Sequence, residues 1–302
     1  MKIIMCQPAN LRFEWELKVV LTNLSNLGYN NVVLLMLKED STVITNLKEA
    51  FPKVEIFSFD DNREDKGYIP SIKPYLWYRF LTENPSYENE DYLYIDSDVI
   101  FREMIDYEQF MNDDVWYGSN CSGYLDTNYV LYTDNGAEIL EGMCRIVGIK
   151  PEQAMLFDGN YIGAQLIVKK PKASFWYKVY KDSIKIWRYL EQIQSNIQKW
   201  TAEMWAQCYN MIYFNIKQEQ NSEFDFTWAT DSVENWYKNK IFHNAGVSEG
   251  TSDLFFKGEF IYNTPFNTDL SFVSNQNAQY FYVKAIENVK KWGLSAKIFP
   301  IF

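Results

Sequence analysis

The stretch DYLYIDSDVIF, residues 91–101, decides the fold prediction. It runs apolar and aromatic, as a buried strand does, and then places Asp96 and Asp98 on either side of Ser97. An ionised carboxylate is costly in an apolar environment unless a partner compensates it, and the nearest basic residue, Arg102, lies beyond the stretch. Two interpretations stay open at this point. Either the strand surfaces and both acids face water, or a divalent cation such as Mg²⁺ or Mn²⁺ binds them.

The segments before this stretch alternate between strand and helix patterns. Strand patterns cover residues 3–6, 31–37 and 54–59, and helix patterns cover residues 11–27, a short segment with Ile44 and Leu47, and residues 71–81. This alternation predicts a parallel sheet with helices on both faces, in which ligands bind beyond the carboxyl ends of the strands. Asp96 and Asp98 are expected to lie at such an end.

The second half of the chain is less regular. Helix patterns cover residues 135–148, 174–200, 201–215 and 279–292, and strand patterns cover residues 161–168 and 240–244. The chain has no internal repeat, low-complexity tract or Pro/Gly-rich linker, so one continuous domain is the simplest interpretation.

The composition is that of an ordinary soluble globular protein, with 302 residues, 23% of them charged and 47% hydrophobic. No run approaches the roughly 18 apolar residues that a membrane-spanning helix needs. The N-terminal MKIIMCQPAN has too short an apolar run for a signal peptide and is expected to form a first strand. No CxxC spacing occurs, so neither a zinc site nor a disulfide framework is indicated, and a reducing, cytoplasmic setting fits best. The cysteines are Cys6, Cys121, Cys144 and Cys208.

The charge balance disfavours bulk nucleic acid as a partner. With 29 basic and 40 acidic residues the net charge is −11, which repels a polyanion unless a basic groove is concentrated near the site. The closest basic cluster, formed by Lys169, Lys170 and Lys172, is small and is equally well explained as a solvated turn.

Several short motifs follow one another in an order that resembles a known family. They are IKPYL (72–76), YIDSDVIF (94–101), GAQLIV (163–168), WTAEMWAQ (200–207), FHNAG (242–246) and FFKG (255–258). Together they cover nearly the whole chain and resemble the GT-A-fold glycosyltransferases, which use nucleotide sugars. The order looks most like the group that contains glycogenin, bacterial lipopolysaccharide galactosyltransferases and plant peptidyl-serine or hydroxyproline glycosyltransferases.

The resemblance implies a fold and a division of the chain. The expected fold is α/β, a GT-A-like, Rossmann-type mixed sheet flanked by helices in a single domain of residues 1–302. Residues 1–105 would form the nucleotide-sugar-binding half. Residues 106–302 would form the acceptor half, with a C-terminal segment that supplies a metal ligand.

The resemblance also implies a metal site. Asp98 is expected to coordinate Mn²⁺ or Mg²⁺ directly, and Asp96 to contact the ion or the nucleotide ribose. His243, the only histidine, lies in an HNAG context that matches the family's HxxG metal ligand, although a lone histidine is more often structural. The family's phosphate-binding lysine corresponds to Lys257, which lies further along the chain than the common spacing.

Two residues are expected near the reacting sugar. Lys73, before Pro74 at an expected exposed helix start, is either a surface lysine or a contact to phosphate or sugar. Glu203 shares a polar helical stripe with Gln207 and Asn210; it either favours the helix dipole or, as the family implies, is the catalytic acidic residue. Because both positions are expected to be exposed, their replacement should change the unfolding temperature little.

Three further polar residues are expected to bind substrate. Asp158 and Asn160 precede the strand at 161–168, where they could hydrogen-bond sugar or acceptor hydroxyls, although a plain loop explains them equally well. Gln165 lies in the family-like GAQLIV motif. Trp200, in contrast, is expected to be a core residue because its segment has the pattern of a buried helix.

The predicted function is a metal-dependent hexosyl- or pentosyltransferase. It would move a sugar from a nucleoside-diphosphate donor, UDP-linked by resemblance, to a protein, a glycan or a small molecule. A phosphatase with an Asp-x-Asp nucleophile usually carries that motif on the first strand with a hydroxyl residue soon after, whereas Val99 and Ile100 follow here. A non-catalytic nucleotide-sugar-binding module and a phage-type DNA glycosyltransferase stay open.

Overall fold

The computed structural model describes residues 1–295, so residues 296–302 of the predicted domain lie outside the described part. The predicted strands and helices of the first half all form. They are β1 (Lys2–Pro8), α1 (Leu11–Asn26), β2 (Val32–Leu37), α2 (Ser41–Ala50), β3 (Glu55–Phe59), α3 (Ile72–Glu83) and β4 (Asp91–Tyr94). The predicted end of the first helix is confirmed: Gly28 adopts a φ of +81°, which glycine tolerates without strain.

These elements build a seven-stranded mixed sheet in the order β3-β2-β1-β4-β7-β6-β8. The strands from the first half are parallel, as predicted, and β7 (Ile162–Lys169) is antiparallel to both β4 and β6 (Trp116–Asn120). The sheet ends with β8 (Gln218–Gln220), parallel to β6. The expected mixed sheet is confirmed, whereas the short strands β6 and β8 were not predicted.

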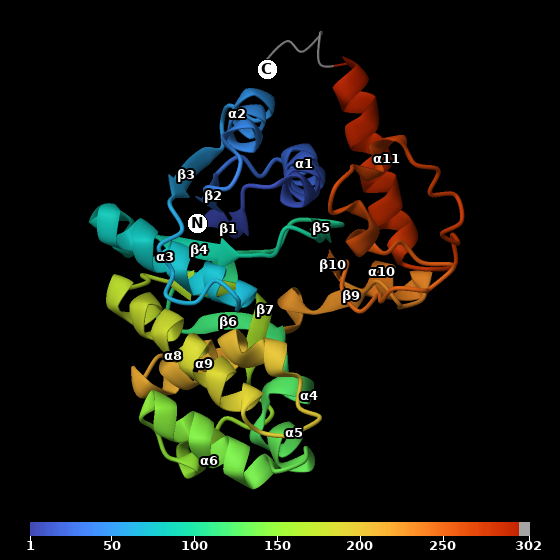
Figure 1. Ribbon diagram of the computed structural model, residues 1–302. Coiled ribbons are helices and arrows are strands. Elements are labelled where there is room, and N and C mark those ends of the chain that lie inside the picture. Colours follow the sequence, from blue (N-terminus) through green and yellow to red (C-terminus); the bar gives the residue numbers. More distant parts are fainter. Residues whose placement is uncertain (296–302) are drawn as a thin grey trace.

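Helices cover both faces of the sheet (Figure 1). Helices α1 and α2 lie on one side of the parallel strands, and α3 lies on the other side, which also carries the second-half helices that precede β8. Those are α4 (Ser122–Leu125), α5 (Thr127–Tyr132), α6 (Gly136–Val147), α7 (Pro151–Met155), α8 (Ala173–Glu191) and α9 (Ala202–Tyr213). The helix expected over residues 174–200 was predicted too long, because α8 ends at Glu191.

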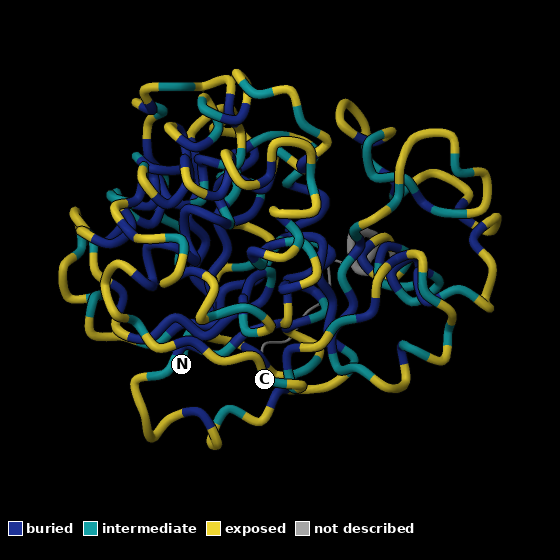
Figure 2. Tube along the Cα trace, turned by 90° about the horizontal axis from the view of Figure 1, so that it is seen from below, coloured by how far each residue is buried: buried dark blue, intermediate teal, exposed yellow. Residues whose placement is uncertain are grey.

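Strand β2 shows why the sheet has a hydrophobic core on each of its faces. Its residues are all buried, with Val33 and Leu35 in the cluster toward α3 and Leu34 and Met36 in the cluster toward α1. Successive side chains of a strand point to opposite faces, so a continuous apolar run serves both layers at once. Figure 2 shows these buried segments running together through the interior, with exposed residues concentrated in peripheral loops.

The stretch 91–101 is not one strand, contrary to the sequence interpretation. Strand β4 ends at Tyr94, and the chain then crosses to β5 (Val99–Phe101), which belongs to a separate three-stranded sheet. There β5 pairs antiparallel with β10 (Ile241–His243), and β10 pairs parallel with β9 (Phe226–Trp228). Asp96 and Asp98 therefore lie on the link between two sheets.

The C-terminal segment packs back onto the first helix. After α10 (Val233–Lys238), the chain reaches α11 (Gln279–Ser295), which lies beside α1 (Figure 1). A third core joins Trp15 of α1, Phe242 of β10 and Tyr282 of α11. Among residues 1–295, no helix is both long and apolar enough to span a membrane.

Candidate active site

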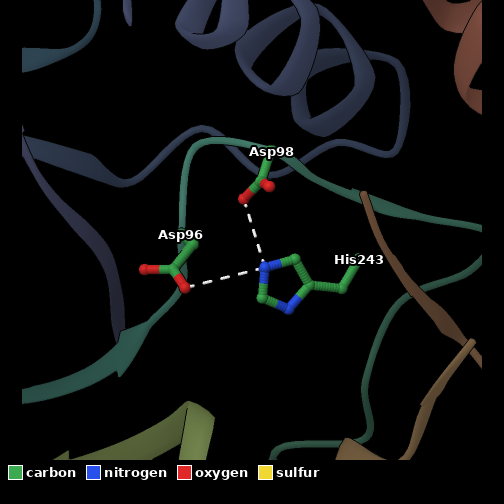
Figure 3. Close-up of side chains that lie close together, drawn as sticks. All are labelled: Asp96, Asp98 and His243. Carbon is green, nitrogen blue, oxygen red and sulfur yellow. Dashed lines mark ion pairs between the residues drawn. The ribbon is translucent and has the colours of Figure 1, made fainter. Parts of the chain in front are cut away.

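The two aspartates and the histidine meet where β4 and β10 end and β5 begins (Figure 3). His243 Nε2 lies 3.2 Å from Asp98 Oδ1 and 3.7 Å from Asp96 Oδ2. The antiparallel pairing of β5 and β10 brings them together, since His243 is opposite Val99, the residue after Asp98. The backbone N–H of Asn244 also donates to the Asp98 carbonyl at 2.9 Å, which ties the two segments together.

Gln165 and Trp228 hold the rest of the histidine ring. His243 Nδ1 lies 3.3 Å from Gln165 Nε2, and the ring lies nearly parallel to Trp228 at an interplanar angle of 3°. Gln165 is fully buried, and its Oε1 accepts a hydrogen bond from Ser119 Oγ at 2.8 Å. Gln165 thus fixes the orientation of His243; the structure does not place it on the wall of the open cavities described below.

Lys257 reaches the same site from the segment after β10. Its ammonium forms an ion pair with Asp98 Oδ2. Burial alone would raise the pKa of Asp98, but the positive charges of Lys257 and His243 outweigh burial and lower it well below its usual range. The displaced position of Lys257 in the sequence therefore does not keep it from the site.

The residues that meet here fit a divalent cation. One oxygen of each aspartate and one nitrogen of His243 lie within 4.8 Å of one another. Hard carboxylate oxygens with a single imidazole suit Mn²⁺, and two carboxylates also suit Mg²⁺. The tertiary structure therefore answers why a strand pattern ends in two negative charges: His243 and Lys257 face them.

Ser97, between the two aspartates, points to the first helix instead. Its Oγ donates a 2.6 Å hydrogen bond to Glu16 Oε2, and Arg12 Nε donates to Glu16 Oε1 at 3.1 Å. The sequence interpretation missed Arg12 and Glu16. Their i,i+4 spacing in the helix directly after the first strand was the available signal.

Lys73 and Glu203 form a second charged pair in the cleft. Lys73 Nζ lies 2.9 Å from Glu203 Oε1, and their side chains are only 14% and 6% exposed. Tyr94 bridges this pair to the first site, because its hydroxyl donates to Asp96 Oδ1 at 2.7 Å and its ring lies 4.9 Å from Lys73 Nζ. The expectation that Lys73 and Glu203 are exposed was wrong. Lys73 on α3 is largely buried and Glu203 on α9 is buried, and the two charges lie against each other.

The polar stripe of α9 does not face solvent either. Glu203, Gln207 and Asn210 are all buried. Asn210 Nδ2 donates to Asp182 Oδ2 of α8 at 3.1 Å, so this part of the stripe joins two packed helices. A helix that lies between a sheet and another helix buries its polar face as well as its apolar face.

Two cavities adjoin at Asp96. The smaller, of ≈ 210 Å³, is lined by Cys6, Lys73, Tyr94 and Glu203 among others, and the larger, of ≈ 500 Å³, by Arg12, Asp98, His243, Trp228 and Lys257 among others. Residues common to both walls are Gln7, Phe13, Asp96, Ala164, Trp200 and Met204. Trp200 is 58% exposed at this junction, so its assignment to the core was wrong. The 3-10 turn at Lys199–Thr201 presents it, where a continuous helix was expected.

Asp158 and Asn160 lie away from both cavities. Asp158 accepts hydrogen bonds from the backbone N–H and the hydroxyl of Thr127 at the start of α5. Asn160 binds the backbone of β8, at Gln218 O and Gln220 N, each at 2.9 Å. Both side chains bind the backbone of a neighbouring loop or strand. This agrees with the alternative that they belong to an ordinary loop and do not bind substrate.

The basic cluster is neutralised within the protein. Lys169, Lys170 and Lys172 form ion pairs with Asp113, Asp114 and Glu88 respectively. Lys169 is also buried, where it donates to the carbonyl of Asp113. The cluster therefore offers little free positive charge to a polyanion.

Comparisons with known proteins find likeness in structure alone. No protein-family model matches the chain, and no curated protein matches it by sequence. Solved structures do match. One of them is the apo structure of the bifunctional glycosyltransferase WbbM, which matches 97% of this chain at a TM-score of 0.52 and 13% sequence identity. The match spans 51% of the WbbM chain, so this protein corresponds to about half of that enzyme's length.

Two further matches are structures of the galactosyltransferase LgtC. One holds donor and acceptor sugar analogs, with a TM-score of 0.49, 13% identity, and coverage of 96% of this chain and 99% of LgtC. The other is an active-site mutant, with a TM-score of 0.47, 11% identity, and coverage of 99% and 98%. At such identities only the fold follows, and it follows from the WbbM match: the chain has the GT-A-type fold of a glycosyltransferase.

Proposed function

We propose that this protein is a metal-dependent glycosyltransferase that transfers a sugar from a nucleoside-diphosphate sugar, with UDP as the nucleotide. The observation that carries the proposal is the Asp96, Asp98 and His243 cluster beside Lys257, at the carboxyl end of the parallel strands. Ligands of open α/β sheets bind at this edge. The GT-A-type fold supports the same conclusion.

The residues of the two cavities would have three separate tasks: metal binding, phosphate binding and sugar binding. Asp96, Asp98 and His243 would hold Mn²⁺ or Mg²⁺, which as a Lewis acid stabilises the charge that builds on a departing diphosphate. Lys257 borders the same cavity and would bind a phosphate oxygen. Lys73 and Glu203, on the wall of the smaller cavity, would bind and orient the transferred sugar, with Glu203 next to the reacting carbon.

The acceptor in this proposal is a protein, a glycan or a small molecule. A net charge of −11 disfavours DNA, and the ion pairs of Lys169, Lys170 and Lys172 support that exclusion. A reducing, cytoplasmic setting is proposed from the cysteines, which are all free and buried. The chain would be divided near residue 105 into donor and acceptor halves.

The test is release of the nucleotide from a panel of nucleotide sugars with Mn²⁺, with EDTA as the control. We expect UDP release from at least one UDP-sugar, abolished by EDTA. Duplex DNA, hydroxymethylated or not, should neither gain sugar nor accelerate the release. Transfer to DNA would overturn the acceptor proposal. Binding of a nucleotide sugar without release, across the panel and with candidate acceptors present, would favour the binding-module alternative.

A further inference from the structure

Arg12 is a basic residue on the wall of the candidate active site that has no role in the function proposed above. It borders the ≈ 500 Å³ cavity together with Asp98, His243 and Lys257. Its guanidinium lies 5.0 Å from the centre of the Phe13 ring, and its side chain is 28% exposed to solvent. Among the described side chains, those of residues 1–290, the Nη atoms of Arg12 have no hydrogen-bond acceptor, so both Nη groups remain for a ligand.

Glu16 holds Arg12 in this position. Its side chain is 1% exposed, which is costly for a carboxylate unless each oxygen has a partner. Oε1 accepts from Arg12 Nε at 3.1 Å and Oε2 from Ser97 Oγ at 2.6 Å. Because the Nε edge is bound to Glu16 at the first turns of α1, the opposite edge of the guanidinium is fixed relative to the turn that carries the aspartates.

The cavity wall carries Glu16, Asp96 and Asp98 as well as Arg12 and Lys257, so it favours an anion once a divalent cation is bound to the aspartates. Arg12 and Lys257 line the same cavity from opposite ends of the chain, and each has one carboxylate partner, Glu16 and Asp98 respectively. A phosphate bound between Arg12 and Lys257 would be attracted by both positive charges. A planar guanidinium with both Nη amino groups available matches the oxygens of a phosphate.

We propose that Arg12 is a second phosphate-binding cation, which binds the donor's diphosphate beside Lys257, and that buried Glu16 is the positioning residue that orients it. This inference rests on the proposed function, since the phosphate belongs to the nucleotide donor. The diphosphate leaving group would then be bound from two sides, by Arg12 of α1 and by Lys257 of the C-terminal segment.

The same helix supplies a matched control. Lys18 and Glu14 form another i,i+4 ion pair on α1, with Lys18 27% exposed, close to the 28% of Arg12. Neither lines either cavity. An effect that arises merely from losing a cation on this helix must therefore appear in Lys18→Ala as well.

The experiment is calorimetric binding of UDP, UMP and uridine in the presence of Mn²⁺. We expect Arg12→Ala to weaken UDP binding at least about tenfold, as loss of a charge-assisted hydrogen bond does, and uridine binding less than about twofold. Arg12→Lys should restore part of the loss. Glu16→Gln should weaken UDP binding by about threefold to tenfold and flatten its dependence on ionic strength, while Lys18→Ala and Glu14→Gln match the wild type.

Thermal unfolding verifies that each variant is folded, and Arg12→Gln serves if Arg12→Ala is not. Equal UDP affinity in the wild type and the Arg12 variants overturns the inference while the proposed function stands. Equal losses for UDP and uridine also overturn it, because they indicate a structural role. If the wild type does not bind UDP with Mn²⁺, both proposals fail.

Discussion

Lys257 forms its ion pair with Asp98 across 159 positions of sequence, and so joins the C-terminal segment to the link between the two sheets. Asp98 is 6% exposed and has Lys257 on one oxygen and His243 on the other. A cation bound at this site would share Asp98 with Lys257. The pair therefore couples the metal site to the phosphate side of the cavity.

Lys257→Met should change the affinities for metal and nucleotide in opposite directions. Removing the ammonium ends its competition for Asp98, so Mn²⁺ alone should bind about threefold to tenfold more tightly. UDP should bind about tenfold more weakly, because a charged phosphate contact is lost. Calorimetric titrations of Mn²⁺ and then of UDP measure both; a change of the same sign in both would contradict this account.

Asp98→Asn should remove most of the Mn²⁺ affinity. An amide oxygen carries no full charge, and Asp98 is the acid held closest to His243, at 3.2 Å against 3.7 Å for Asp96. We expect a loss of at least about tenfold, measured by calorimetry or by the Mn²⁺ electron spin resonance signal. Asp134→Asn, at an exposed position, is the control. Unchanged binding in Asp98→Asn would exclude this residue as a ligand.

Gln165→Leu should also weaken Mn²⁺ binding, although Gln165 would not touch the ion. The substitution removes the amide beside His243 Nδ1, and partners of metal-binding histidines typically contribute about tenfold to affinity. It also leaves Ser119 without one acceptor, so the unfolding free energy should fall by about 1 kcal/mol. Loss of stability with intact metal affinity would show that Gln165 serves the core alone.

Lys73→Ala should destabilise the protein, contrary to what an exposed position would give. Glu203 would be left buried without its partner, and removing one member of a buried pair costs about 3 kcal/mol or more. Urea unfolding should detect this loss, whereas Lys172→Ala in the exposed pair with Glu88 should stay within about 0.5 kcal/mol. Equal stability of the two variants would mean that water solvates the carboxylate of Glu203 once Lys73 is removed.

The stability of the metal-free protein should depend on pH through His243. Burial lowers the pKa of His243, but the charges of Asp98 and Asp96 outweigh burial and raise it above 6.5. A raised pKa means that the charged imidazole stabilises the native state below about pH 6.5, and that this contribution is lost as pH rises through the native pKa.

Urea unfolding in EDTA therefore should show the largest difference between the wild type and His243→Gln near about pH 5.5, and a smaller one near about pH 8.5. With Mn²⁺ present, the added stabilisation should grow over the same range, because a metal ligand must be a neutral imidazole. A difference that does not vary with pH would contradict the raised pKa.

The local patterns of the sequence determined the first half of the fold. The periodicity of residues 11–27 and the apolar run of 31–37 suffice for α1 and β2, because the period of side-chain direction is a property of each element alone. The break in the stretch 91–101 was not visible, since β5 forms by pairing with β10 from far along the chain. Short strands such as β8 carry too few residues to show a period.

The sequence by itself also determined which residue types could form the site, through the acids Asp96 and Asp98 and the single His243. Only the tertiary structure decided their partners: Lys257 on Asp98, Lys73 on Glu203, and Gln165 on His243. It likewise turned Asp158 and Asn160 toward the backbone. The physical reason is that the cost of a buried charge depends on which distant groups the fold brings within a few ångströms, and that distance is not encoded in any local spacing.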